Sequence, residues 1–259
     1  MTAPLFHLAP GRLDGLAAGS PVVLDGPEGH HAATVMRLAQ GEEVQLSDTV
    51  STRASGVVTE AAAGRLTVEI REIRQEHVER PRLVLVQALA KDKRDLQAVE
   101  SATELGVDAV IPWQADRSVA RWKAGREAKK HAEWVSTVTG AAKQTRRTAI
   151  PEVRQLVTTA EYVRSLKEAG GLGVVVLHET EEVSLAAVLE DLGALGDRSP
   201  LEELHLVVGP EGGISEAEIA ALRGAGARSA RLGRTVLRSS TAGPAAIAGT
   251  QVILDRWDW

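Results

Sequence analysis

The chain has 259 residues, a formal net charge of −5 and no cysteine. Its apolar content of 44% is enough for one large core or two modest ones, and two are expected at this length. The lack of cysteine excludes disulfides, thiolate catalysis and cysteine-ligated metals. No run of eighteen apolar residues and no charged-then-apolar leader occurs, so we expect a cytoplasmic protein that contacts no membrane.

Residues 1–73 contain short alternating segments divided by turn residues, a pattern typical of a small β-barrel. The expected strands are 22–24, 43–46, 56–58 and 66–70, with one short helix at 30–38. A polar stretch at 74–80 ends at Pro81 and predicts a linker.

From Pro81 onward, long apolar strands alternate with helical patterns. The expected strands are 83–89, 107–111, 172–177, 204–208 and 229–232. The expected helices are 94–105, 125–143, 185–192, 216–223 and 242–254. We therefore expect an α/β domain over 81–259, with a mainly parallel sheet covered on both faces.

Two loops of this domain expose their backbone. The first is Val208-Gly209-Pro210-Glu211-Gly212-Gly213, and the second runs from Leu232 to Ala242. Glycine lets a ligand approach the main chain, and open α/β sheets usually bind ligands at the carboxyl ends of strands. A capping box at Ser215-Glu216-Ala217-Glu218 starts a helix beside the first loop. The two loops predict one ligand site.

The net charge hides an uneven distribution. It is −4 for residues 1–80, +5 for 81–150, −9 for 151–227 and +3 for 228–259. The two basic tracts are either solvated helix faces or a surface for a polyanion.

Ordered motifs along nearly the whole chain resemble the RsmE family, which belongs to the SPOUT class of RNA methyltransferases. In chain order, the matching residues are His30-His31, Val35-Met36-Arg37-Leu38, Gly41-Glu42, Gln87-Ala88-Leu89, Lys91, Thr103-Glu104-Leu105-Gly106-Val107, Arg117-Ser118-Val119, Ala142, Gln144, Arg147, Leu177-His178-Glu179, and the two loops with Val236-Leu237-Arg238 and Thr241-Ala242.

The resemblance implies a PUA-like barrel over 1–73 that binds RNA, and a SPOUT domain over 81–259 with a trefoil knot. It implies a homodimer that uses S-adenosylmethionine to methylate N3 of a uridine in small-subunit (16S) ribosomal RNA, free or in the assembled subunit. The alternative is an RNA-binding ribosome-assembly factor whose catalysis has lapsed. A Rossmann-type nucleotide enzyme is disfavoured because no G-x-G-x-x-G follows the first strand.

Methylation of uridine N3 requires loss of its proton and stabilisation of the charge that develops on O2 and O4. Arg238 matches the family arginine and is either that stabilising group or an ion-pair partner within the knot. Glu211 either accepts a proton or braces its loop, and a nearby helix N-terminus favours its charged, weakly basic form. Ser239 and Ser240 replace the threonine and glutamate of the family pattern.

The resemblance also assigns two sets of binding residues. Those expected to hold the cofactor are Leu177, His178, Gly209, Pro210, Gly213, Leu232, Gly233 and Leu237. Those expected to contact RNA phosphates are Arg37, Lys91, Arg94, Arg121, Lys143, Gln144, Arg146 and Arg147.

The remaining candidate side chains are read mainly as structural. Trp113, Trp122 and Trp134 belong either to the core or to a base-stacking surface, and core is favoured. Trp257 and Trp259 are placed at a dimer interface. The seven histidines have no metal-ligand spacing, so no metal is expected.

Overall fold

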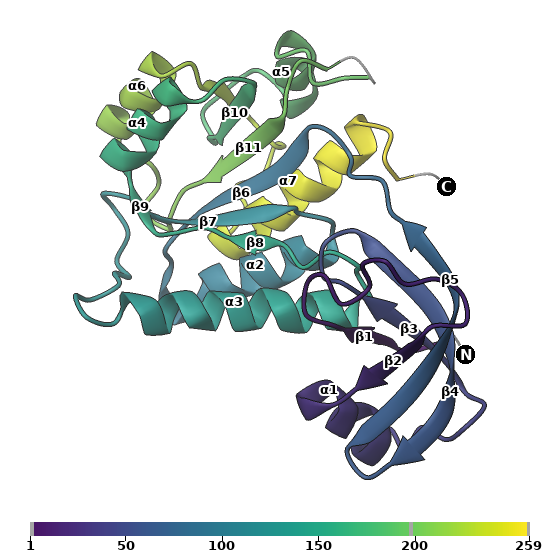
Figure 1. Cartoon of the computed structure of the whole chain (residues 1–259). Helices are drawn as coiled ribbons and strands as arrows, with labels where there is room; N and C mark the ends of the chain where they lie inside the picture. The colour runs from purple at the N-terminus through teal and green to yellow at the C-terminus, as the bar shows by residue number, and fades with distance from the viewer. Residues whose placement is uncertain (1–2, 197–198, 258–259) are drawn as a thin grey trace. The chain divides into compact units, whose positions relative to one another are not determined.

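The computed structural model describes residues 3–196 and 199–257. By its contacts the chain divides into two compact units, Met1–Val78 with Ala142–Ile150, and Glu79–Ala141 with Pro151–Trp259 (Figure 1). Residues 142–150 were expected in the second domain, but this segment groups with the first unit. Ser47 Oγ donates to Thr148 O at 2.6 Å, and Arg53 Nε donates to Thr148 Oγ1 at 2.7 Å.

The first unit is a five-stranded sheet of order β1-β3-β4-β5-β2, in which only the β1–β3 pair is parallel. Its strands are β1 Leu5–His7, β2 Pro21–Leu24, β3 Glu43–Ser47, β4 Thr52–Ala62 and β5 Arg65–Gln75. A helix, α1 Gly26–His30, continues into a π-helical turn, η1 His31–Val35, so the expected helix at 30–38 starts earlier. Arg74 and Gln75, expected in the linker, belong to β5. Alternate strand residues form the core, as the period of two predicts.

The second unit is built on seven strands, and every strand pair in it is parallel, as expected. The order is β12-β10-β11-β6-β7-β8, with β9 also paired to β7. The bounds are β6 Arg82–Ala88, β7 Ala109–Gln114, β8 Glu152–Val153, β9 Val157–Thr158, β10 Leu172–Leu177, β11 Glu203–Val208 and β12 Arg228–Ala230.

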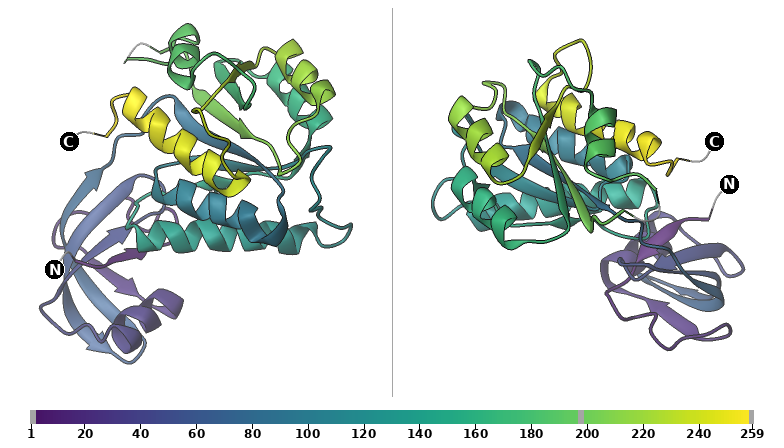
Figure 2. Two further views of the ribbon diagram at one scale, coloured as in Figure 1. Left: turned by 180° about the vertical axis from the view of Figure 1, so that it is seen from behind. Right: turned by 90° about the horizontal axis from the view of Figure 1, so that it is seen from above.

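The helices of this unit lie on both faces of the sheet (Figure 2). Their bounds are η2 Lys91–Lys93, α2 Arg94–Glu104, α3 Glu127–Gln144, α4 Thr159–Glu168, α5 Leu185–Asp191, α6 Glu216–Gly224 and α7 Ser239–Ile253. Among these α-helices, only α4 was not expected from the sequence. Its start carries a capping box between Thr158 and Glu161, a local signal that was present in the sequence.

The alternation of side chains along β6 determines which helices cover each face. Val84 and Val86 pack in a core that includes Trp113 and Tyr162. Leu85 points to the opposite face, where a Cβ at Gly243 of α7 would lie 3.0 Å from its methyl groups. Helix α7 therefore approaches the sheet closely at a residue without a side chain.

The tryptophans mostly serve this core. Trp113 is completely buried and donates from Nε1 to Thr159 Oγ1 at 3.1 Å. Trp134 is buried and meets Trp122 edge to face, with ring centroids 6.1 Å apart. Trp257 is half-buried after α7, whereas Trp259 lies outside the described residues. The core interpretation holds for Trp113 and Trp134.

A polar cluster is buried at the start of β11. Arg154 donates two hydrogen bonds to Glu203, at 2.9 and 2.5 Å, and His205 Nε2 donates to Glu203 at 3.0 Å. The Tyr162 hydroxyl donates to His205 Nδ1 at 2.8 Å. Burial lowers the pKa of His205, so we assign it as neutral. The hydrogen bond from His205, with those from Arg154, lowers the pKa of Glu203 despite burial.

No helix in the described ranges is both long and apolar enough to cross a bilayer.

Candidate active site

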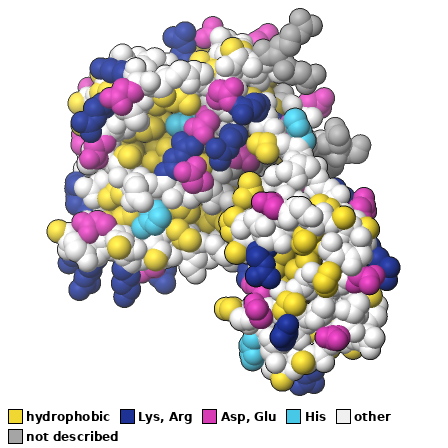
Figure 3. All heavy atoms as spheres, in the orientation of Figure 1, with side chains coloured by type: hydrophobic (Ala, Val, Ile, Leu, Met, Phe, Trp, Pro, Cys, Tyr) yellow, Lys and Arg dark blue, Asp and Glu magenta, His cyan; other side chains and the backbone are white. Residues whose placement is uncertain are grey.

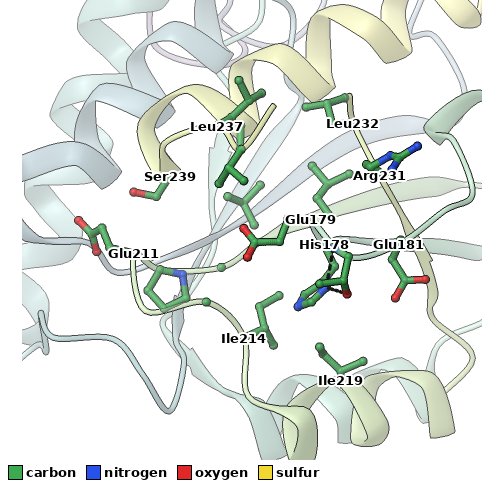
Figure 4. Close-up of a pocket in the computed structure, with 18 of the residues that line it drawn as sticks. His178, Glu179, Glu181, Glu211, Ile214, Ile219, Arg231, Leu232, Leu237 and Ser239 are labelled. Atoms are coloured by element: carbon green, nitrogen blue, oxygen red, sulfur yellow. Dashed lines mark hydrogen bonds between the residues drawn. The ribbon is translucent and has the colours of Figure 1, made fainter. Parts of the chain in front are cut away.

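A cleft of about 1010 Å³ opens at the carboxyl ends of β10, β11 and β12, and we call it the strand-end cleft (Figure 4). Three loops line it: residues 178–181 (the β10 loop), 209–214 (the glycine loop) and 231–238 (the arginine loop). These loops meet because their strands are parallel neighbours in the order β12-β10-β11. Helix α6 contributes Ile219 to the wall.

The structure brings all eight expected cofactor residues to this cleft. They are Leu177, His178, Gly209, Pro210, Gly213, Leu232, Gly233 and Leu237. The lining combines apolar side chains with open backbone, which suits a flat heterocycle held by main-chain hydrogen bonds.

Two of the glycines serve different purposes. A Cβ at Gly233 would meet no atom within 4 Å, so the space beside this backbone is open. A Cβ at Gly209 would lie 2.6 Å from Ile214 Cγ1, within its own loop. Glycine at 209 is therefore required for packing of the loop, whereas the Gly233 backbone is accessible to a ligand.

The end of the glycine loop is held by a buried carboxylate. Glu218 is 2% exposed and accepts hydrogen bonds from Asp116 N at 2.9 Å, Ser215 N at 3.0 Å and Thr159 Oγ1 at 2.6 Å. Burial alone would raise the pKa of Glu218, but these hydrogen bonds outweigh it and keep the pKa below its usual value. The expected capping box at Ser215 and Glu218 is present.

Glu211 forms an ion pair. Arg94 Nη1, at the start of α2, donates to Glu211 Oε1 at 3.3 Å, and both side chains are partly buried and line the cleft. The pair links the glycine loop to α2. This geometry supports the bracing interpretation of Glu211.

Arg238 is the N-cap residue of α7 and its side chain lines the cleft. It forms no ion pair with any described residue, so the alternative role of an ion-pair partner has no counterpart in the structure. Ser239 follows it, is 6% exposed, and its hydroxyl has no hydrogen-bond partner in the structure. A free cation and an unpartnered hydroxyl thus lie next to each other at the start of α7.

The β10 loop is anchored on both sides of Glu179. His178 Nδ1 accepts a hydrogen bond from Thr180 Oγ1 at 2.9 Å, and Arg223 Nη2 donates to Glu181 Oε1 at 2.5 Å. Figure 4 shows His178, Glu179 and Glu181 leaving this loop in different directions.

The residues expected to contact RNA fall into two groups. The second unit carries Lys91, Arg94 and Arg121, and the first unit carries Arg37, Lys143, Gln144, Arg146 and Arg147. Several already have partners: Arg94 pairs with Glu211, Lys143 pairs with Glu28, and Arg121 Nη2 donates to Asp116 O at 3.2 Å. On the face shown in Figure 3, basic and acidic side chains are interspersed.

Sequence reasoning missed two contacts that shape the cleft. Arg117, known from sequence only as part of a motif, donates from Nη1 to Gly212 O at 3.2 Å. A Cβ at Gly212 would lie 3.2 Å from Arg117 Cβ, so the loop after β7 packs directly on the glycine loop. The role of Glu218 beyond its capping box was also missed, because Asp116 and Thr159 are distant in sequence.

Within the described ranges, no group of three or more His, Asp or Glu side chains could hold a metal ion.

Comparisons with known proteins identify the family. Residues 78–251 match the RNA methyltransferase domain family, and residues 24–71 match the RNA methyltransferase PUA domain family. The ribosomal RNA small subunit methyltransferase E of Mycobacterium bovis is 43% identical over 242 residues, covering 93% of this chain and 89% of that protein. The Bacillus subtilis protein of the same name is 26% identical over 220 residues, and the match covers 85% of each chain.

Solved structures agree with these matches. The crystal structure of the Neisseria gonorrhoeae ribosomal RNA small subunit methyltransferase E bound to S-adenosyl methionine gives a TM-score of 0.80, at 26% identity, covering 97% of this chain and 98% of that one. A Legionella pneumophila structure in complex with bound SAM gives 0.78, at 27% identity and the same coverage. The expected α/β fold and family are confirmed: the chain belongs to the RNA methyltransferase family, within the group of ribosomal RNA small subunit methyltransferases E.

Proposed function

We propose that this RNA methyltransferase uses S-adenosylmethionine to methylate N3 of a uridine in small-subunit (16S) ribosomal RNA. The observation that carries the proposal is the convergence of all eight expected cofactor residues on the strand-end cleft, in a chain that matches two structures determined with this cofactor bound.

The cleft fits the cofactor. Leu177, Leu232 and Leu237 provide apolar surfaces for an adenine ring, and the open backbone at Gly233 leaves N–H and C=O groups for its polar edge. When bound, S-adenosylmethionine supplies an electrophilic methyl group on a sulfonium. The protein must then orient the acceptor and stabilise the charge that develops on it.

Arg238 is suited to stabilise that charge. Deprotonated uridine N3 spreads negative charge over O2 and O4, and a guanidinium can donate to one of these oxygens from a fixed planar group. Arg238 lines the cleft without an ion pair to any described residue, so its donors are available to the substrate. We assign it the catalytic role that the sequence predicted.

Glu211 is assigned to bracing. Its ion pair with Arg94 fixes the glycine loop and gives its carboxylate a structural partner. We therefore do not assign Glu211 as the group that removes the N3 proton.

The basic residues of the two units are proposed as phosphate contacts. Lys91 is exposed at the strand-end side of the second unit, and Arg37 and Arg146 are exposed in the first unit. Such contacts position RNA without reading its bases. The assembled small subunit and free 16S RNA are both candidate substrates, in the cytoplasm.

A homodimer is proposed as the working form, with a trefoil knot in the second unit as the family resemblance implies. Val236 of the arginine loop is 73% exposed and Val252 of α7 is 52% exposed. Burial of these side chains against a second copy of the chain would remove apolar surface from water. Sedimentation equilibrium tests the oligomeric state.

Titration calorimetry with S-adenosylmethionine separates the enzyme from a lapsed assembly factor. Saturable binding with one site per chain supports the proposal. Absence of binding heat at several temperatures, with the protein folded, would support the alternative instead.

A further inference from the structure

Glu179 is a carboxylate of the strand-end cleft that has no partner. It directly follows His178 at the end of β10, is exposed, and forms no hydrogen bond or ion pair with any described residue. Two other carboxylates of the wall are neutralised: Arg94 holds Glu211, and Arg223 holds Glu181. Figure 4 shows the Glu179 carboxylate directed from the β10 loop toward the side of the cleft that carries Glu211.

The direction of Glu179 follows from its neighbours. On one side, Thr180 bonds back to the imidazole of His178, and on the other, Arg223 fixes Glu181. The intervening Glu179 lines the cleft, is exposed and forms no hydrogen bond with a described residue. An unpaired carboxylate at this place repels phosphates and attracts a cation or a hydroxyl donor.

The rest of the charged lining is rich in arginine, so an unpaired carboxylate there would favour a cationic ligand. Four arginines line the cleft without an ion pair to any described residue, namely Arg117, Arg231, Arg234 and Arg238. They favour RNA but disfavour S-adenosylmethionine, whose methionine part carries a sulfonium and an ammonium beside one carboxylate.

We propose that Glu179 binds the positively charged methionine part of S-adenosylmethionine, rather than the ribose hydroxyls. The inference rests on the proposed function, since it takes this cofactor as the ligand of the cleft. Glu179 is thus a residue that determines cofactor affinity by charge.

The test compares three ligands by titration calorimetry at low ionic strength, using the full-length chain. The ligands are S-adenosylmethionine, its demethylated product S-adenosylhomocysteine, and 5′-methylthioadenosine, which keeps adenine and ribose but lacks the amino-acid group. The proteins are the wild type, Glu179→Gln and Glu216→Gln. Glu216 is a matched control because it also lines the cleft without an ion pair to a described residue, but it lies in the first turn of α6, where the helix N-terminus offsets its charge.

Glu179→Gln is expected to weaken binding of S-adenosylmethionine by about fivefold, through the loss of one exposed charge contact, and to leave the affinity for 5′-methylthioadenosine within about twofold. A parallel loss for S-adenosylhomocysteine assigns the contact to the ammonium. A loss confined to S-adenosylmethionine assigns it to the sulfonium. Either result supports the inference, and Glu216→Gln should leave all three affinities nearly unchanged.

Three results would overturn it: unchanged affinity for S-adenosylmethionine in Glu179→Gln, an equal loss for 5′-methylthioadenosine, or an equal effect of Glu216→Gln. A wild type that binds none of the ligands would instead contradict the proposed function. Because Glu179 is exposed and unpartnered, the glutamine variant should keep the wild-type thermal midpoint, which is measured alongside.

Discussion

Replacement of Glu218 by alanine should destabilise the second unit and loosen the glycine loop. The change removes one buried carboxylate that accepts from Asp116 N, Ser215 N and Thr159 Oγ1 at 2.6 to 3.0 Å. A hydrogen bond to a charged group contributes about 1.5–3 kcal/mol, and a buried donor left unpaired costs about 1–3 kcal/mol. Since water entering the cavity satisfies part of this demand, we expect a total loss of about 3–5 kcal/mol.

The assay is urea unfolding followed by tryptophan fluorescence. The described tryptophans all belong to the second unit, and the sequence of the first unit contains none, so the signal reports on the second unit. Glu216→Ala is the matched control, because Glu216 is in the same first turn of α6 but is exposed and forms no ion pair with a described residue. It should change the unfolding free energy by less than about 0.5 kcal/mol.

Calorimetry supplies a second readout for the same pair of variants. Displacement of the glycine loop in Glu218→Ala should weaken S-adenosylmethionine binding, whereas Glu216→Ala should not. If the two variants unfold at the same urea concentration, the reasoning that Glu218 anchors the loop is refuted.

Three further predictions concern the cleft and the buried cluster. Gly233→Val places a side chain in the open space beside the backbone, so it should lower cofactor affinity more than tenfold, about 1.4 kcal/mol or more, without changing the thermal midpoint. Unchanged affinity by calorimetry would place the cofactor elsewhere. Arg238→Ala should reduce the rate of methyl transfer at least a hundredfold, about 2.7 kcal/mol, and keep the cofactor affinity, whereas Arg234→Ala should retain most activity. Full activity of Arg238→Ala in a methylation assay would contradict its catalytic role. The pKa of His205 is lowered in the folded state, so its contribution to stability is present above about pH 6.5 and is lost as pH falls below that value. Between pH 7.5 and 5.5, the free energy of unfolding in urea should therefore fall less in His205→Gln than in the wild type, and equal falls would contradict the neutral assignment.

Much of this fold follows from local pattern. The periods of two and 3.6 residues located the central strands and most helices of the second unit, because buried strands such as β11 and capped helices such as α6 carry their signals in adjacent residues. The longest strands, β4 and β5, were located only in part. Helix α4 was missed although Thr158 and Glu161 form a capping box, because its ten residues follow two strands of only two residues each. The segment 142–150 was assigned to the wrong unit because its partners are distant in the sequence.

The candidate site shows the same division. The loops of the cleft were predictable because glycines and parallel strand ends are read directly from sequence, and the family motif supplied Arg238. The anchors were not predictable. Glu218 bonds to residues about 60 and 100 positions away, and Arg94 meets Glu211 only through the fold. Glu179 differs from Glu181 and Glu211 in having no ion pair with a described residue, and only coordinates show this difference.

The central claim is tested most directly by identification of the modified nucleoside. Purified small subunits and free 16S RNA, each lacking the modification, are incubated with the protein and S-adenosylmethionine carrying an isotopically labelled methyl group. The RNA is then digested and analysed by liquid chromatography and mass spectrometry. The account predicts labelled 3-methyluridine in at least one of the two substrates. Label in another nucleoside, or none in either substrate with a protein that binds the cofactor, would contradict it.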